Sequence, residues 1–134
     1  MNDKIMTVIF VAVIFFISFL LFQKSQPKIV NFTTLTSEKL FTMLSQKDFF
    51  FVNVHIPYEG EIKNTDAFIP YDRIADNLEK LPKDKDAKIV LYCKSGRMSE
   101  IVARELTQLG YMQITHLSGG MIDWKKNGYE IVKN

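Results

Sequence analysis

An uncharged apolar run near the amino terminus divides this chain into two parts that must fold differently. The eighteen residues from Ile5 to Phe22 carry no charge, and only Thr7 and Ser18 among them are polar. A helix needs about 20 apolar residues to cross a bilayer, whereas a helix in a soluble domain usually carries charges along one face. The run therefore predicts a membrane-spanning helix through residues 5–22. The rest of the chain is long enough for one ordinary domain.

The flanks of the run distinguish an anchor from a cleaved signal peptide. A signal peptide has a shorter apolar stretch and small residues before its cleavage site, but Gln23 and Lys24 follow this run. We therefore predict that residues 1–28 are a membrane anchor or uncleaved signal sequence with a short linker, and that residues 29–134 form the domain. Lysines on both sides leave the positive-inside rule nearly balanced. A short tail before an anchor commonly stays inside, which predicts a domain outside the cytoplasm.

The predicted domain has no net charge. The chain has 17 basic and 15 acidic residues, of which three and one lie in residues 1–28, so residues 29–134 contain 14 of each. Nucleic-acid binding usually requires a basic excess, and we therefore expect no nucleic-acid partner. The single cysteine excludes an intramolecular disulfide and a zinc site built from several cysteines.

Apolar runs of strand length alternate with helical patterns through the domain. The runs at 49–54, 88–92 and 113–117 have the near-continuous hydrophobicity of strands that are covered on both faces. Strands that alternate with helices predict an α/β fold with a mainly parallel central sheet flanked by helices. We expect helices at 36–44 with Thr36 as N-cap, at 72–81 with Asp72 as N-cap, at 99–109, and around Trp124, with a loop at 56–71.

The segment that carries candidate chemistry is Cys93-Lys94-Ser95-Gly96-Arg97-Met98-Ser99, between a predicted strand and a predicted helix. In parallel sheets this position is the carboxyl edge, where ligands bind. The N–H groups of a tight loop and the amino end of a helix create positive potential there, and Lys94 and Arg97 add cationic charge. A thiol in these surroundings is biased towards the thiolate, which is the nucleophilic form. We therefore predict that Cys93 is a nucleophile in an anion-stabilising loop.

A structural interpretation of the same loop remains open. A free cysteine is often a small buried hydrophobic residue, although a structural Cys93 would not need Gly96 and two cations in the next four positions. Ser99 either caps the following helix or turns its hydroxyl towards the sulfur.

Four segments, in this order and spacing, resemble a rhodanese-type sulfurtransferase domain over roughly residues 34–132. They are the early strand with its end, Phe51-Val52-Asn53-Val54-His55, the approach to the next helix, Phe68-Ile69-Pro70-Tyr71, the loop Cys93 to Ser99, and the closing Leu117-Ser118-Gly119-Gly120 with Trp124.

The resemblance implies a three-layer fold and a double-displacement reaction. Cys93 would accept sulfane sulfur from a donor such as thiosulfate and become a persulfide, and a small thiol or a protein cysteine would then take the sulfur. No metal or organic cofactor is implied. The residues implied to bind the donor and stabilise the persulfide are Lys94, Ser95, Gly96, Arg97, Met98 and Ser99.

The sequence departs from the family pattern near the early strand. Asn53 replaces the usual Asp, His55 replaces the usual Arg, and the segment 60–67 replaces the usual Gly-His-Ile-Pro-Gly-Ala. These changes bear on the choice of substrate. His55 is either a partly exposed loop residue or an accessory proton donor near the site. We expect His116, at a strand end, to be structural.

Two other functions compete with sulfur transfer. Phosphatases of the dual-specificity cell-cycle type share the fold, but their loop is one residue longer and places Arg at the sixth position after Cys. Here the sixth position is Ser99 and Arg97 is at the fourth. The loop is therefore shorter than that of the phosphatases, with room for a single sulfur atom. The second alternative is a membrane-tethered sulfur carrier or protein-binding module with little turnover of its own.

Overall fold

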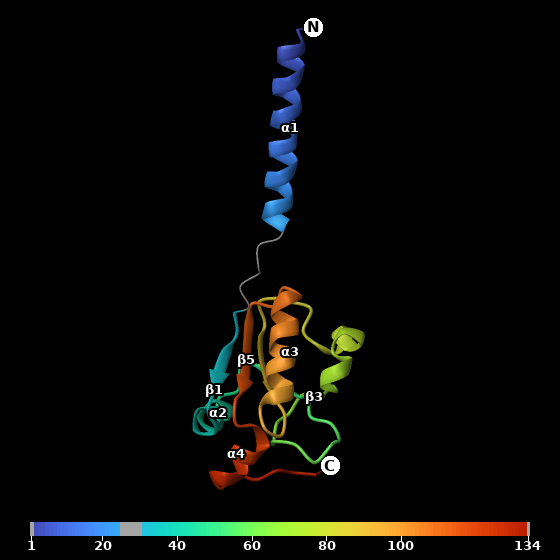
Figure 1. The fold of residues 1–134 in the computed structure, drawn as a ribbon. Helices are drawn as coiled ribbons and strands as arrows, with labels where there is room; N and C mark the ends of the chain where they lie inside the picture. Colours follow the sequence, from blue (N-terminus) through green and yellow to red (C-terminus); the bar gives the residue numbers. More distant parts are fainter. Residues whose placement is uncertain (1, 25–30, 134) are drawn as a thin grey trace.

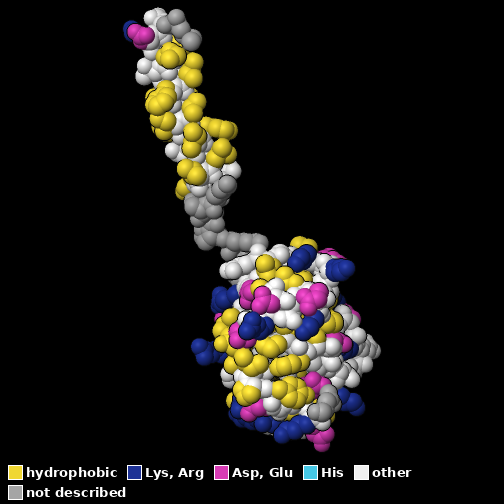
Figure 2. All heavy atoms as spheres, turned by 90° about the vertical axis from the view of Figure 1, so that its right-hand side faces the viewer, with side chains coloured by type: hydrophobic (Ala, Val, Ile, Leu, Met, Phe, Trp, Pro, Cys, Tyr) yellow, Lys and Arg dark blue, Asp and Glu magenta, His cyan; other side chains and the backbone are white. Residues whose placement is uncertain are grey.

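A long helix and an α/β domain make up the computed structural model, which describes residues 2–24 and 31–133. Helix α1 (Asp3–Lys24) contains the predicted span (Figure 1). The side chains of residues 3–23 are all exposed, and many of them are hydrophobic (Figure 2). By length and composition, Asp3–Gln23 is apolar enough to cross a membrane. Such a helix fits an anchor or a signal sequence equally. The predicted linker around Pro27 lies outside the described residues.

The domain is built on a parallel sheet, as predicted. The strands within the described residues are β1 (Thr33–Leu35), β2 (Phe50–Asn53), β3 (Ala67–Phe68), β4 (Lys88–Tyr92) and β5 (Gln113–Leu117). Their spatial order is β1-β5-β4-β2-β3, and each neighbouring pair is parallel. β4 is therefore central, and the residue that follows it lies at the carboxyl edge of the sheet.

Helices cover both faces of the sheet and give the predicted three layers (Figure 1). One face packs against α3 (Arg97–Gln108) and the 3₁₀ helices η1 (Tyr71–Arg73) and η2 (Ala75–Lys80). The other face packs against α2 (Ser37–Leu44) and α4 (Gly120–Lys126).

Strand β4 shows why its sequence reads as one continuous apolar run. Ile89 and Leu91 belong to the core beneath α3, whereas Val90 and Tyr92 belong to the core beneath α2 and α4. Alternate side chains of a strand point to opposite faces, and here both faces are covered. By the same alternation Cys93, the next residue, points to the α3 side.

The segment 72–81 differs from its prediction. It forms two short 3₁₀ helices, and Asp72 lies inside η1 and not at an N-cap. Asn77 interrupts the helical backbone with φ −132° and ψ 29°. Its side-chain amide donates to the Arg73 carbonyl at 2.8 Å, and such local bonds compete with regular helix.

Candidate active site

The loop after β4 is closed by a glycine in the left-handed conformation. Gly96 has φ +95° and directly precedes α3, and its N–H donates to Cys93 Sγ at 3.1 Å. A Cβ at this position would lie 1.9 Å from the Ser118 carbonyl oxygen. Glycine is therefore required both by the backbone angle and by the close approach of the chain after β5.

Cys93 combines burial with polar surroundings. The residue is only 1% exposed and packs in the core on the α3 side. Its sulfur nevertheless accepts the Gly96 N–H and lies 3.7 Å from Ser99 Oγ. The interpretation of Cys93 as a small buried hydrophobic residue thus describes its exposure correctly but does not account for its polar partners. An amide N–H that points at sulfur stabilises negative charge there.

Helix α4 fixes the first residues of the loop through their carbonyl groups. The Met121 N–H donates to the Cys93 carbonyl and the Ile122 N–H to the Lys94 carbonyl, both at 2.9 Å. A Cβ on Gly120 would lie 2.5 Å and 2.4 Å from these two oxygens. The Gly119-Gly120 pair therefore lets the helix approach the loop and bind its carbonyls. This arrangement turns the carbonyl oxygens towards α4.

Ser99 is the third residue of α3 and not its N-cap, because the helix begins two residues earlier than predicted. Its buried hydroxyl donates to the Gly96 carbonyl at 3.0 Å and lies 3.2 Å from His116 Nδ1. The alternative prediction, that the hydroxyl faces the sulfur, is confirmed by the 3.7 Å separation.

The remaining predicted site residues of the loop lie at its surface. Lys94, Ser95 and Arg97 are exposed and Met98 is partly buried. The roles of the two cations in binding stay predictions.

Glu59 joins the loop to His55 and was not identified from the sequence. Its carboxylate binds Lys94 Nζ at 2.9 Å and His55 Nε2 at 2.5 Å. The Lys94 ammonium and, next, the His55 ring lower the pKa of Glu59. His55 is 6% exposed and so is not the partly exposed loop residue of one interpretation. Its accessory role stays a prediction, and Glu59 separates it from Lys94.

The segment that replaces the usual family sequence at 60–67 is tied to the core. Asn53 donates its side-chain amide to the Gly60 carbonyl at 3.1 Å and accepts the His55 N–H at 3.0 Å. Asn in place of Asp therefore still braces the turn after β2.

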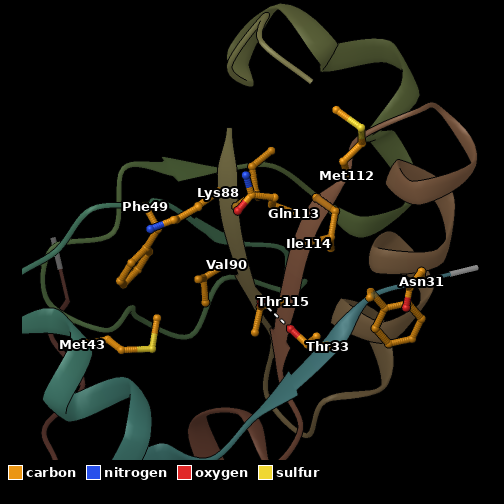
Figure 3. A pocket seen from close by; sticks show the side chains of 12 residues that line it. Asn31, Thr33, Met43, Phe49, Lys88, Val90, Met112, Gln113, Ile114 and Thr115 are labelled. Carbon is orange, nitrogen blue, oxygen red and sulfur yellow. Dashed lines mark hydrogen bonds between the residues drawn. The ribbon is translucent and has the colours of Figure 1, made fainter. Parts of the chain in front are cut away.

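Two hollows in the surface of the described domain lie at different distances from the cysteine loop. One, of about 420 Å³, adjoins Lys94 and Glu59 and is also lined by Lys125 and Lys133. The other, of about 290 Å³, lies at the amino ends of β1, β4 and β5 (Figure 3). Cys93 follows the carboxyl end of β4 and is therefore at the opposite edge of the sheet. Its one charged lining residue, Lys88, is paired with Asp48, so this second hollow offers no candidate chemistry. The described residues contain no group of three or more potential metal ligands among His, Cys, Asp and Glu.

Comparisons with known proteins agree with this geometry. The profile of the rhodanese-like domain matches residues 45–127. A sulfurtransferase of Allochromatium vinosum is 34% identical over 101 residues, 73% of this chain and 92% of that protein. A tRNA uridine(34) hydroxylase of Erwinia tasmaniensis is 31% identical over 102 residues, 72% of this chain but only 29% of that protein.

A solved structure supports the same assignment. The rhodanese-like domain protein of Staphylococcus aureus has 30% sequence identity and a TM-score of 0.63, and the match covers 75% of this chain and 99% of that one. The fold has three layers, with helices on both faces of a parallel sheet, and the cysteine loop lies at the carboxyl edge of that sheet. Together with this fold, the matches show that the chain belongs to the rhodanese-like domain family.

Proposed function

We propose that this protein is a sulfurtransferase that carries sulfane sulfur as a persulfide on Cys93. The observation that carries the proposal is the Gly96 N–H directed at Cys93 Sγ, at 3.1 Å, in a loop at the carboxyl edge of the sheet. An amide in this position donates a hydrogen bond to the sulfur, and the same donor would stabilise a negatively charged persulfide. Family membership and the match to a sulfurtransferase over 92% of its length support the same chemistry.

The proposed reaction has two displacements. The Cys93 thiolate attacks the outer sulfur of thiosulfate, the S–S bond of thiosulfate breaks, and sulfite leaves with the bonding electron pair. The product is the Cys93 persulfide. The thiolate of an acceptor, a small thiol or a protein cysteine, then attacks the terminal sulfur and releases the Cys93 thiolate. No external oxidant or reductant is needed, because the electron pair of each broken S–S bond leaves with the departing group, sulfite in the first step and the Cys93 thiolate in the second.

The charges around the loop suit an anionic donor. Lys94 and Arg97 are exposed beside the loop, and thiosulfate carries two negative charges. Arg97 lies at the first position of α3, where the helix amino end adds positive potential. We assign to these two residues the attraction of the donor, and to Ser95 and Met98 the walls of its approach.

Mass spectrometry of the full chain, purified in detergent and incubated with thiosulfate, tests the proposal. We expect Cys93 to gain one sulfur atom, which cyanide then removes as thiocyanate, and we expect Cys93→Ser to gain none. Because Cys93 is the only cysteine, no other thiol can account for the gain. An unmodified Cys93 after thiosulfate and after polysulfide would contradict the proposal.

A membrane-tethered sulfur carrier is the second candidate, favoured by the exposed apolar helix α1. A carrier would load sulfur in the same experiment but turn over slowly with cyanide and faster with its partner's cysteine. We further propose that residues 5–22 anchor the chain in a membrane and that the domain lies outside the cytoplasm. Retention in the membrane pellet at alkaline pH tests the anchor. Digestion of the domain by protease added to intact spheroplasts tests the side, and a protected domain would refute it.

A further inference from the structure

A buried polar chain leads from the sulfur of Cys93 to a histidine beneath it. Cys93 Sγ lies 3.7 Å from Ser99 Oγ, with the thiol as donor, and the same oxygen lies 3.2 Å from His116 Nδ1. Cys93, Ser99 and His116 are 1%, 0% and 4% exposed. Three polar groups in hydrogen-bond sequence, all shielded from water, connect the loop after β4 with α3 and β5.

The surroundings of His116 leave its ring neutral near pH 7. Burial lowers its pKa, the Glu100 carboxylate opposes this effect, and the Arg104 guanidinium adds to it. Both charged residues belong to α3 and pair with each other at 2.6 Å. From the segment before β1, the Phe32 ring meets the imidazole edge to face, with centroids 5.5 Å apart. The ring is therefore held in place and neutral, so that Nδ1 can accept a hydrogen bond from Ser99.

Ser99 has one hydroxyl proton and two acceptors within reach. The hydroxyl donates to the Gly96 carbonyl at 3.0 Å in one orientation and to His116 Nδ1 at 3.2 Å in the other. In the second orientation the oxygen still accepts the Cys93 thiol proton. The chain then runs in one direction, from sulfur through oxygen to nitrogen.

We propose that His116 takes up the proton of the Cys93 thiol through Ser99, as a positioning residue that acts on the nucleophile without touching the substrate. The S–H proton moves to Ser99 Oγ as the hydroxyl proton moves to His116 Nδ1. The products are a thiolate, which accepts hydrogen bonds from Ser99 and the Gly96 N–H, and an imidazolium. No heavy-atom bond changes, and the reverse transfer restores the thiol. The inference rests on the proposed function only in taking Cys93 as the nucleophile.

The rate of Cys93 alkylation by iodoacetamide, measured against pH on the full chain in detergent micelles, tests this proposal. His116→Asn keeps a hydrogen-bonding group near Ser99 but cannot take up a proton. We expect its alkylation profile to move up by about one pH unit, so that the rate near pH 7 falls about tenfold. The rates should converge at high pH, where the thiol is ionised in both proteins. A purely structural effect would change the rate by the same factor at every pH, and a profile superimposable on the original would overturn the proposal.

Ser99 provides the matched pair of variants. Ser99→Ala interrupts the chain and is expected to move the profile as His116→Asn does, whereas Ser99→Thr keeps a hydroxyl and is expected to leave it near its original position. A Ser99→Ala protein that folds and shows the original profile would refute transfer through Ser99.

A second measurement does not depend on how these variants fold. The pH titration of the His116 ring, followed by NMR before and after Cys93 is alkylated, reports the coupling from the other end. A neighbouring thiolate favours imidazolium, so alkylation is expected to lower the His116 midpoint, and an unchanged midpoint would overturn the proposal. Neither measurement requires sulfur transfer. If thiosulfate does not load sulfur on Cys93 but the coupling between Cys93 and His116 is observed, the proposed function alone is refuted. If sulfur is loaded but the coupling is absent, only this inference is refuted.

Discussion

Replacing Gly96 by alanine tests whether the cysteine loop depends on the close approach of the chain after β5. Gly110→Ala is a matched control, because the backbone angle φ is +93° at Gly110 and +95° at Gly96. A Cβ on Gly110 would meet nothing within 4 Å, whereas a Cβ on Gly96 would lie 1.9 Å from the Ser118 carbonyl oxygen. The two substitutions therefore share the strain of a positive φ and differ in the overlap.

The expected free energies follow from these two effects. An alanine forced to positive φ costs about 1–2 kcal/mol, and this is the whole expected loss for Gly110→Ala. The overlap at Gly96 is with backbone, which cannot rotate away as a side chain can. Overpacking of this kind adds about 1–3 kcal/mol. Gly96→Ala is therefore expected to lose about 2–5 kcal/mol, a large part of the stability of a typical domain.

Urea denaturation of both variants measures the free energy of unfolding, and alkylation of Cys93 measures the state of the loop. For Gly96→Ala we also expect the alkylation rate to change, because the Gly96 N–H that binds Cys93 Sγ has to move with its residue. Gly110→Ala should leave that rate unchanged. Equal losses of stability in the two variants, with equal alkylation rates, would refute the reasoning.

Three further predictions concern other contacts of the domain. Glu59→Gln removes the charge that pairs with Lys94 and is expected to lower the KM for thiosulfate by about two- to fivefold, the range of an exposed ion pair; steady-state kinetics that show a higher KM would contradict this. Tyr92→Phe leaves the buried Ile62 N–H without the phenol oxygen that it binds at 3.0 Å, and urea denaturation should show a loss of about 1–3 kcal/mol, whereas a loss near zero would count against that bond. Because the pKa of His116 is lowered in the folded chain, the unfolded chain binds the proton more readily, and the free energy of unfolding is expected to fall as the pH drops below about 6.5. His116→Asn should reduce this fall between pH 7.5 and 5.5, and an undiminished fall would show that another group is responsible.

The sequence predicts the central strands of the fold because a strand that is buried on both faces has a nearly continuous apolar sequence. β4 and β5 have the predicted bounds, 88–92 and 113–117. α2 starts after Thr36, whose hydroxyl accepts the Lys39 N–H at 3.3 Å as a capping residue should. In these elements local propensity and tertiary burial favour the same structure.

Short edge strands escape prediction for the opposite reason. β1 and β3 have three and two residues, and each has a partner on one side only. β3 lies just before Pro70 in a segment whose turn residues indicate a loop. Its strand character comes from pairing with β2, in the register Val52 to Ala67 and Asn53 to Phe68. Nothing in two residues of sequence encodes such a pairing.

The candidate site shows the same division between local and distant causes. Cys93 and its loop are visible in seven consecutive residues, but Glu59 is 35 positions from its partner Lys94 and His116 is 17 positions from Ser99. Single charged or aromatic residues in loops and strands have many possible partners. Only the parallel sheet, which brings the ends of β2, β4 and β5 to one edge, determines which partner each one meets.

The orientation of the cysteine loop depends on a helix that the loop's own sequence does not specify. In a tight turn, either N–H groups or carbonyl oxygens could face the sulfur, and carbonyls would repel a thiolate. The first amides of α4 bind the carbonyls of Cys93 and Lys94, and Gly120 makes the approach possible. The glycine pair and the cysteine loop, 20 or more residues apart, are therefore one structural unit. A related chain that keeps the cysteine but has a larger residue at the position of Gly120 should fold its loop differently, because the carbonyl oxygens would no longer be held towards α4.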